Sequence, residues 1–194
     1  MPLLDRLKTE TRSNHVQTET LLYAEKLMAG TLTRAELRHL LTIHYRFHQA
    51  LETAVAAQPD FFAGYDHDQR QKTPWLLADM EQFGIDPDQS NPDLFSGWNG
   101  YELLGALYVG EGSTLGGQVI AKALRRTPGL GDDATTLRFF GGYGNQTGPL
   151  WKDFGTYLLN RADGQEEVII DAARRAFDLF GKLATEPQSM TLYP

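Results

Sequence analysis

LLGALYVGEGSTLGGQVIAKAL, residues 103–124, combines the apolar spacing of a helix with five glycines among its first fifteen residues. Each interior glycine costs a helix about 1 kcal/mol relative to alanine. Five would cost roughly 3–5 kcal/mol, a large share of a small domain's net stability. A chain that keeps them needs bare backbone against a neighbouring group. The glycines are Gly105, Gly110, Gly112, Gly116 and Gly117.

Three structures are compatible with such a stretch: a phosphate-binding loop, a close helix–helix contact, or a kinked helix lying over a flat ligand. A dinucleotide fingerprint needs two residues between its second and third glycines. Three residues separate Gly112 from Gly116, and no Gly-Lys-Ser/Thr follows. The spacing therefore argues against a phosphate loop. Packing through the pair Gly112 and Gly116, and a ceiling over a flat ligand, both remain open.

Composition narrows the class of protein. The chain has 194 residues, 41% of them hydrophobic, which predicts one domain over residues 1–194 with a real core. The net charge of −7 argues against nucleic acid or an anionic membrane as a partner. The absence of cysteine excludes disulfides, zinc thiolates, thiolate-ligated haem and cysteine-ligated iron–sulfur clusters.

The N-terminal segment MPLLDRLKTE, residues 1–10, has charged residues where a signal peptide would have an apolar core. No apolar run in the sequence is as long as a membrane span. We therefore expect a cytoplasmic protein that does not enter the membrane.

A helical period of three and four residues runs through almost the whole chain and predicts an all-α bundle of about seven helices. Thr33 and Glu36 have the spacing of a capping box. No long stretch alternates with period two, which counts further against a phosphate loop because that loop follows a strand. Besides the glycine-rich segment, the predicted helices cover residues 4–22, 33–55, 69–83, 145–161 and 165–184.

Four of the five histidines offer weak metal-site signals. His44 and His48 lie four apart on an apolar helix face, a spacing that can hold a metal, although core histidines bonded to neighbours are commoner. Glu36 and His39 form one Glu-x-x-His, an element that di-iron bundles use twice, and no second copy occurs. His39 is expected in solvent, and His67 lies in a polar loop.

His15 has different surroundings. Glu19 lies four residues on and can reach the free ring nitrogen, which would fix the tautomer and make the imidazole a better metal donor. Lys8 lies two helical turns back, about 10 Å along the axis. That separation suits a ligand with a metal centre and an anionic edge, as haem has. An amphipathic helix with a polar spot is the alternative.

The chain resembles the haem oxygenases in two segments, LKTETRSNHVQTE, residues 7–19, and LYVGEGSTLGGQVIAKAL, residues 107–124. YGNQTGPLWKDFGTYL, residues 143–158, is similar to the bacterial branch, which includes enzymes that supply bilin to bacterial phytochromes. The resemblance implies a single-domain helical bundle of the haem oxygenase type with a glycine-kinked distal helix.

The resemblance also implies roles for individual residues. His15 matches the proximal iron ligand, Lys8 a lysine that pairs with a haem propionate, and Glu19 a glutamate behind the histidine. Thr11 belongs to the same haem-binding motif. Gly112, Gly116 and Gly117 match glycines that bring the distal helix close over the haem, and we expect Gly116, Gly117 and Ser113 to be the catalytic residues.

The implied reaction opens haem to biliverdin and releases carbon monoxide and iron, so haem is both substrate and cofactor. It consumes dioxygen and electrons from an external donor, which would be a ferredoxin, a flavodoxin or a reductase. The basic side chains near the ends of two helices could steer an acidic donor. They are Lys122, Arg125, Arg126, Arg174, Arg175 and Lys182.

Two departures from the family pattern affect the expected site. Ser113 stands where many members carry an aspartate that anchors distal water, so proton delivery would depend on a hydroxyl. Tyr108 is one position away from a tyrosine expected at a propionate, and the basic residue expected after Trp151 is represented by Lys152 or Arg161.

The chemistry of the residues fits this assignment. A neutral imidazole ligand lets ferrous haem bind dioxygen without the electron push of a thiolate. A distal wall of backbone and small side chains carries no histidine that could act as a peroxidase-type acid, and ordered water can deliver protons there. Two alternatives remain: a haem-binding protein for storage or sensing that does not degrade haem, and a non-haem di-iron relative on the same fold.

Overall fold

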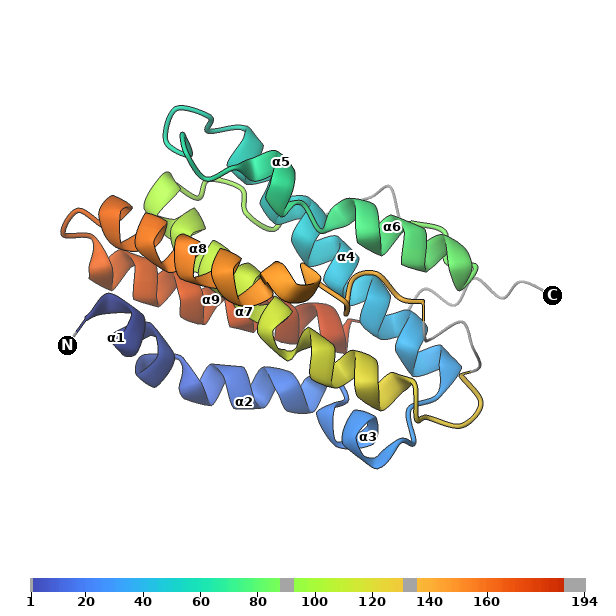
Figure 1. The fold of residues 1–194 in the computed structure, drawn as a ribbon. Helices are drawn as coiled ribbons and strands as arrows, with labels where there is room; N and C mark the ends of the chain where they lie inside the picture. Colours follow the sequence, from blue (N-terminus) through green and yellow to red (C-terminus); the bar gives the residue numbers. More distant parts are fainter. Residues whose placement is uncertain (1, 88–92, 131–135, 187–194) are drawn as a thin grey trace.

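The chain folds into α-helices packed around one long helix, which confirms the predicted all-α class (Figure 1). The computed structural model describes residues 2–87, 93–130 and 136–186, and no β-strand occurs within them. The helices are α1 Leu3–Glu10, α2 Arg12–Leu21, α3 Ala24–Ala29, α4 Arg34–Ala56, α5 His67–Arg70, α6 Thr73–Gln82, α7 Gly100–Leu124, α8 Thr147–Arg161 and α9 Glu166–Thr185, with a 3₁₀ turn η2 at Gly144–Gln146.

The N-terminal segment is not the single helix that the sequence predicts. α1 ends at Glu10, and Thr11 takes a non-helical backbone conformation with φ −103° and ψ 5°. The Thr11 hydroxyl donates to the Leu7 carbonyl at 2.7 Å, a local bond that competes with helix continuation. Tyr23, with φ 65°, then turns the chain from α2 into α3. The straight two-turn relation between Lys8 and His15 is therefore wrong.

The two long helices of the bundle begin with the same cap. At α4 the Glu36 amide donates to the Thr33 hydroxyl at 3.2 Å, and the Thr33 amide donates to the Glu36 carboxylate at 2.9 Å, as predicted. At α7 the residues are Asn99 and Glu102, a cap that the sequence analysis missed. Both caps satisfy amide groups that would otherwise lack partners.

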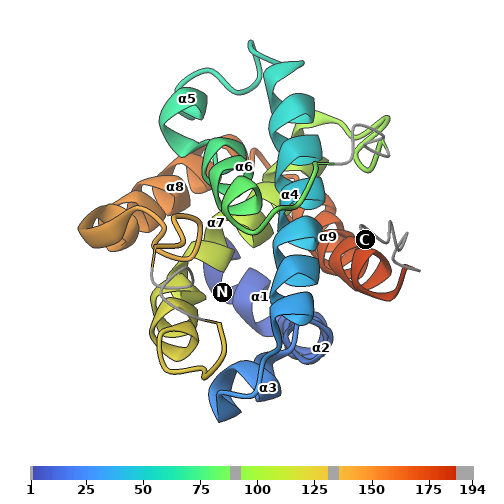
Figure 2. The ribbon, with the colours of Figure 1, turned by 90° about the vertical axis from the view of Figure 1, so that its right-hand side faces the viewer.

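α7 is a continuous helix through all five glycines and lies at the centre of the bundle (Figure 2). It packs against α9, α8, α4 and α3. The close helix contact forms at Gly105, where an added Cβ would meet the carbonyl oxygen of Ile169 and lie 2.8 Å from the Cβ of Ala172. Packing through the pair Gly112 and Gly116 is therefore wrong, because the glycine that α9 requires stands two turns earlier. A kink within α7 stays a prediction.

The helix predicted over residues 69–83 is divided into α5 and α6. Its break at Gln71 and Lys72 is stabilised by Glu52 of α4, whose carboxylate accepts from the Lys72 amide at 2.6 Å. The helices predicted over residues 145–161 and 165–184 correspond to α8 and α9. Among the described residues, no helix has both the length and the apolarity needed to cross a membrane.

Candidate functional site

Two contacts join the proximal segment, α1 and α2, to α7. Burial raises the pKa of Tyr108 on α7, and the buried Thr11 at the α1–α2 junction opposes that rise. At the other end α3 packs against both α2 and α7, and Gly30 approaches the carbonyl of Arg126. Between these two contacts lie most of α2, which carries His15, and the part of α7 from Tyr108 to Leu124, which carries the later glycines.

His15 lies on α2 with 55% of its side chain exposed. Its Nδ1 lies 3.5 Å from the Glu19 carboxylate, which favours the tautomer protonated at Nδ1. The edge of the imidazole ring packs against Phe177. No hydrogen-bond partner for Nε2 is found among the described residues, so its lone pair can accept a metal ion. The expected contact between His15 and Glu19 is present.

The three glycines expected over haem have different neighbours. An added Cβ at Gly116 would meet no atom within 4 Å, so this backbone borders open space. At Gly112 the added Cβ would lie 3.7 Å from the ring of Trp151. At Gly117 it would lie 2.7 Å from the carbonyl oxygen of Phe140. Gly117 is therefore required by the connector before α8, whereas Gly116 presents bare backbone to a potential ligand.

Ser113 is half-buried on α7, and its hydroxyl donates to the Gly110 carbonyl at 2.7 Å. Because that bond uses the hydroxyl proton, Ser113 can only accept a hydrogen bond from a water molecule. An aspartate at this position would accept more bonds and carry a charge. Ser113 can therefore hold a water molecule only as a hydrogen-bond acceptor, because its own proton is already donated to Gly110.

The two basic residues considered for propionates lie in different settings. Lys8 is exposed on α1, where its ammonium can move to meet an anion. Arg161 donates to the Ala63 carbonyl at 3.1 Å and packs over the rings of Phe61 and Tyr157. Arg161 is therefore committed to the loop after α4, and Lys152, exposed near the start of α8, is the freer cation on that helix.

The parts of α2 and α7 that lie between the two contacts joining the proximal segment to α7 have the chemistry of a haem site. Val16 of α2 is 53% exposed, and Leu115 and Val119 of α7 are 46% and 57% exposed. Unpartnered apolar side chains next to open backbone suit a flat apolar ligand. A free imidazole nitrogen on His15 suits the iron, and an exposed lysine on α1 suits an anionic edge. On these observations the residues present fit haem.

A buried ionic cluster lies on another face of α7 and was missed by the sequence analysis. Glu111, only 1% exposed, accepts from Tyr65 at 3.0 Å and from Arg70 at 3.2 Å. Lys72 and Tyr143 complete the cluster, with the Lys72 ammonium 2.5 Å from the carboxylate. A cavity of about 10 Å³ beside it has room for about one water molecule.

A sequence signal for Glu111 existed. Leu104, Leu107 and Glu111 follow the i, i+3, i+7 spacing of a buried helix face, so a carboxylate stands on an apolar stripe. A buried carboxylate needs cationic partners, which predicts that distant basic residues meet it.

His44 and His48 form part of the core. Their rings stack with centroids 6.0 Å apart, and the His44 ring packs among Phe139, Phe140 and Phe180. Among the described residues no group of three or more histidine or carboxylate side chains is placed to hold a metal ion. His39, expected in solvent, instead lies 2.6 Å from the Tyr23 hydroxyl.

Burial of His44 predicts a specific loss of stability in acid. Desolvation lowers the pKa of His44 from 6.5 to about 3, so below pH 6.5 the unfolded chain binds a proton that the folded chain does not. We expect the free energy of unfolding to fall by up to about 1.4 kcal/mol per pH unit for this residue as the pH drops towards its folded pKa. His48, whose pKa is lowered by burial and by the charge of Lys72, adds to the effect.

Urea unfolding of a His44→Phe variant at about pH 6 and about pH 4 measures this contribution. The variant should show a shallower pH dependence than the wild type. Phe180→Leu, which changes a ring that packs on His44, should lower stability by the same amount at both pH values. An unchanged slope in His44→Phe would contradict the assignment.

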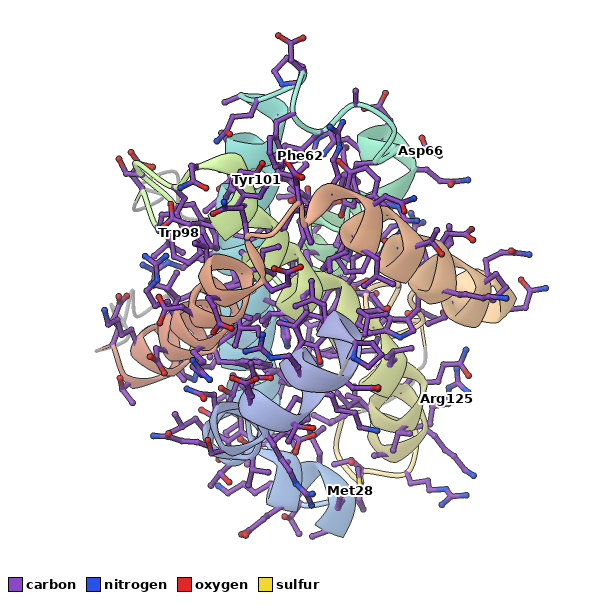
Figure 3. All side chains as sticks on the ribbon, turned by 90° about the vertical axis from the view of Figure 1, so that its left-hand side faces the viewer. Met28, Phe62, Asp66, Trp98, Tyr101 and Arg125 are labelled. Atoms are coloured by element: carbon purple, nitrogen blue, oxygen red, sulfur yellow. The ribbon has the colours of Figure 1, made fainter. Side chains whose placement is uncertain are left out.

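The two basic clusters differ in how free their charges are. Arg174 pairs with Glu10 at 2.8 Å, and Arg175 pairs with Glu102 and packs over Trp98. Lys122, Arg125 and Arg126 are exposed at the end of α7. Figure 3 shows Trp98 and Arg125 on opposite sides of the molecule. Lys182 of α9 is also exposed, so both clusters keep free charge, and three exposed cations are grouped at the end of α7.

Comparison with known proteins gives a consistent result. The family model described as "Heme oxygenase" matches residues 1–186. The structure is similar to heme oxygenase from Leptospira interrogans, with a TM-score of 0.78, 19% identity, and coverage of 96% of this chain and 100% of that chain.

It is also similar to the NO- and CO-bound heme oxygenase from Neisseria meningitidis, with a TM-score of 0.74, 20% identity, and coverage of 95% of this chain and 90% of that chain. At these identities the two structures establish a shared fold. Among curated proteins, none matches this chain.

Proposed function

This chain belongs to the haem oxygenase family, and on that premise we propose that it oxidatively opens haem to biliverdin with release of carbon monoxide and iron. The observation that carries the proposal is the pairing, between the two contacts joining the proximal segment to α7, of a half-exposed imidazole on His15 with the open backbone at Gly116. An electron donor supplies the reducing equivalents. Haem, when bound, supplies the iron that activates dioxygen and the bridging carbon that is oxidised.

The proximal residues bind and orient the substrate. His15 ligates the iron through Nε2, while Glu19 holds the proton at Nδ1 and keeps the imidazole in the required tautomer. Lys8 would pair with a propionate of bound haem and so help to orient it. Thr11 lies buried beside Tyr108 at the junction of α1 and α2. It stabilises the angle between the two helices, and that angle determines the position of Lys8 relative to His15.

The distal residues shape and hydrate the opposite side. Gly112 and Gly116 let the α7 backbone approach the porphyrin face, and Gly117 holds α7 against the connector. Ser113 accepts a hydrogen bond from a water molecule, which delivers protons in place of a charged acid. The exposed cations Lys122, Arg125 and Arg126 offer a docking surface for an acidic ferredoxin or flavodoxin.

Turnover in vitro tests the proposal. Haem-loaded protein mixed with ascorbate, or with a reductase and its electron source, should lose its Soret band while the broad red absorption of biliverdin rises. Catalase added to the reaction removes free peroxide and so excludes unspecific bleaching. A haem complex that persists under reducing, aerobic conditions would contradict the proposal and would favour a haem carrier.

A further inference from the structure

Glu111 is one carboxylate shared by side chains from three separate segments. Tyr65 follows α4, Arg70 and Lys72 flank the break between α5 and α6, and Tyr143 belongs to the connector before α8. Their polar atoms lie 2.5–3.3 Å from the Glu111 carboxylate. Arg70 and Lys72 are themselves buried, so the cluster ties α7 to the α5–α6 break and adds to its packing on the connector.

The cluster requires its negative charge. Burial and the neighbouring carboxylate raise the pKa of Tyr65 and of Tyr143, so both phenols stay neutral and donate hydrogen bonds. Two buried cations then depend on one carboxylate, because Glu52 instead accepts from the backbone amides of Lys72 and Thr73. A buried cation without a partner is strongly destabilising.

Glu111 lies on a different side of α7 from Gly112 and Gly116. At about 100° per residue, Gly112 lies about 100° and Gly116 about 140° around the helix from Glu111. Gly110 and Gly117 pack tightly, with added Cβ atoms 3.1 Å from Leu51 and 2.7 Å from the Phe140 carbonyl. Those contacts stop α7 from moving closer to its neighbours. Packing against α9 and the hydrogen bond that Gln118 donates to the Gly144 carbonyl at 3.0 Å oppose movement away, and the Glu111 ion pairs add a tie towards the α5–α6 break.

We propose that Glu111 is a positioning residue for the haem reaction: its ion pairs with Arg70 and Lys72 hold α7 against these stops and fix the depth at which Gly112 and Gly116 face the substrate. Glu111 touches no substrate and acts through the helix. The inference rests on the proposed function.

Two variants test it, with a matched control. Glu111→Gln removes the charge, and Glu111→Asp keeps the charge but shortens the arm by one methylene, which protects the test if the neutral variant folds poorly. Glu102→Gln is the control, because Glu102 lies on the same helix, caps its first turn and pairs with Arg175.

Hydrogen–deuterium exchange of the haem-free proteins gives the first readout. Amides of residues 110–118 should exchange about tenfold faster or more in both Glu111 variants, whereas residues 101–108 should change little. Glu102→Gln should show the reverse pattern. Unchanged exchange at residues 110–118 in both Glu111 variants would overturn the proposal, and this result does not depend on any haem chemistry.

The C–O stretching frequency of the ferrous carbon monoxide complex gives the second readout, since it reports the distance and polarity of the distal wall. The frequency should shift in both Glu111 variants and stay at the wild-type value in Glu102→Gln. In the double variant Glu111→Gln/Lys72→Met, thermal stability should recover in part while the shifted frequency persists. Recovery of both together, or faster exchange with an unshifted frequency, would reduce Glu111 to a structural role and overturn the proposal.

Failure of the proposed function would look different. In that case the wild-type protein itself would form no haem complex that depends on His15, or would not turn haem over, while the exchange result for Glu111 would stand on its own.

Discussion

Haem-loaded His15→Ala should lose the Soret band of the wild-type complex and should not turn haem over. Nε2 of His15 has no partner among the described residues, and Glu19 lies 3.5 Å from Nδ1, so the ring is arranged to donate one lone pair to iron. Loss of a ligand's hydrogen-bond partner costs about 10–100-fold in affinity or activity. Loss of the ligand itself should cost more.

Absorption spectra and turnover of three proteins measure the effect. His67→Ala is the matched control, because His67 begins α5 on the far side of the bundle from α2 (Figure 1). Added imidazole should restore a wild-type-like Soret band to His15→Ala, since the truncated side chain leaves room for it. The ligand assignment is wrong if His15→Ala keeps the wild-type spectrum, or if His67→Ala changes it as much.

The same substitution at two glycines of α7 should have opposite effects on stability. Gly105→Ala places a methyl group against backbone atoms of α9, 2.8 Å from the Ala173 amide nitrogen, and backbone cannot rotate away. We expect the free energy of unfolding to fall by about 1–3 kcal/mol, because overpacking outweighs the gain in helix propensity. Gly116→Ala meets no atom within 4 Å and should raise it by up to about 1 kcal/mol.

The two variants should differ in the opposite sense in haem binding, which Gly116→Ala weakens and Gly105→Ala does not. The methyl group of Gly116→Ala occupies the space where the porphyrin approaches, so haem affinity should fall roughly 10–100-fold, the equivalent of about 1–3 kcal/mol. Gly105→Ala should bind haem normally wherever it is folded. Urea unfolding of the haem-free proteins and titration with hemin give both numbers. A destabilised Gly116→Ala, or one with wild-type haem affinity, would contradict the role given to this glycine.

Local patterns in the sequence were sufficient for much of the fold. Helix periodicity and the Thr33 cap predicted α4, and the predicted segments for α8 and α9 agree with the structure, because these signals act within a few residues. The breaks at Thr11 and at Lys72 were missed. Each is stabilised by a particular bond, a hydroxyl to its own helix and a carboxylate from α4, which periodicity does not register.

Part of the candidate site could be predicted from local sequence spacing, and part of it could not. The pair His15 and Glu19 could be read from a spacing of four, since one helical turn brings those side chains together. The cluster around Glu111 could not, because its partners are 32–46 residues away and meet only when α7 packs against the α5–α6 break and the connector.

The five glycines of residues 103–117 could be read from the sequence, and they predicted close neighbours for this part of α7. Which group lies beside each glycine depends on the packing of distant segments: α9 lies at Gly105, α4 at Gly110, Trp151 at Gly112 and the connector at Gly117, and Gly116 is left open. A glycine in the sequence shows only that a side chain is absent. Segments far away in the chain determine whether other atoms occupy the space beside it.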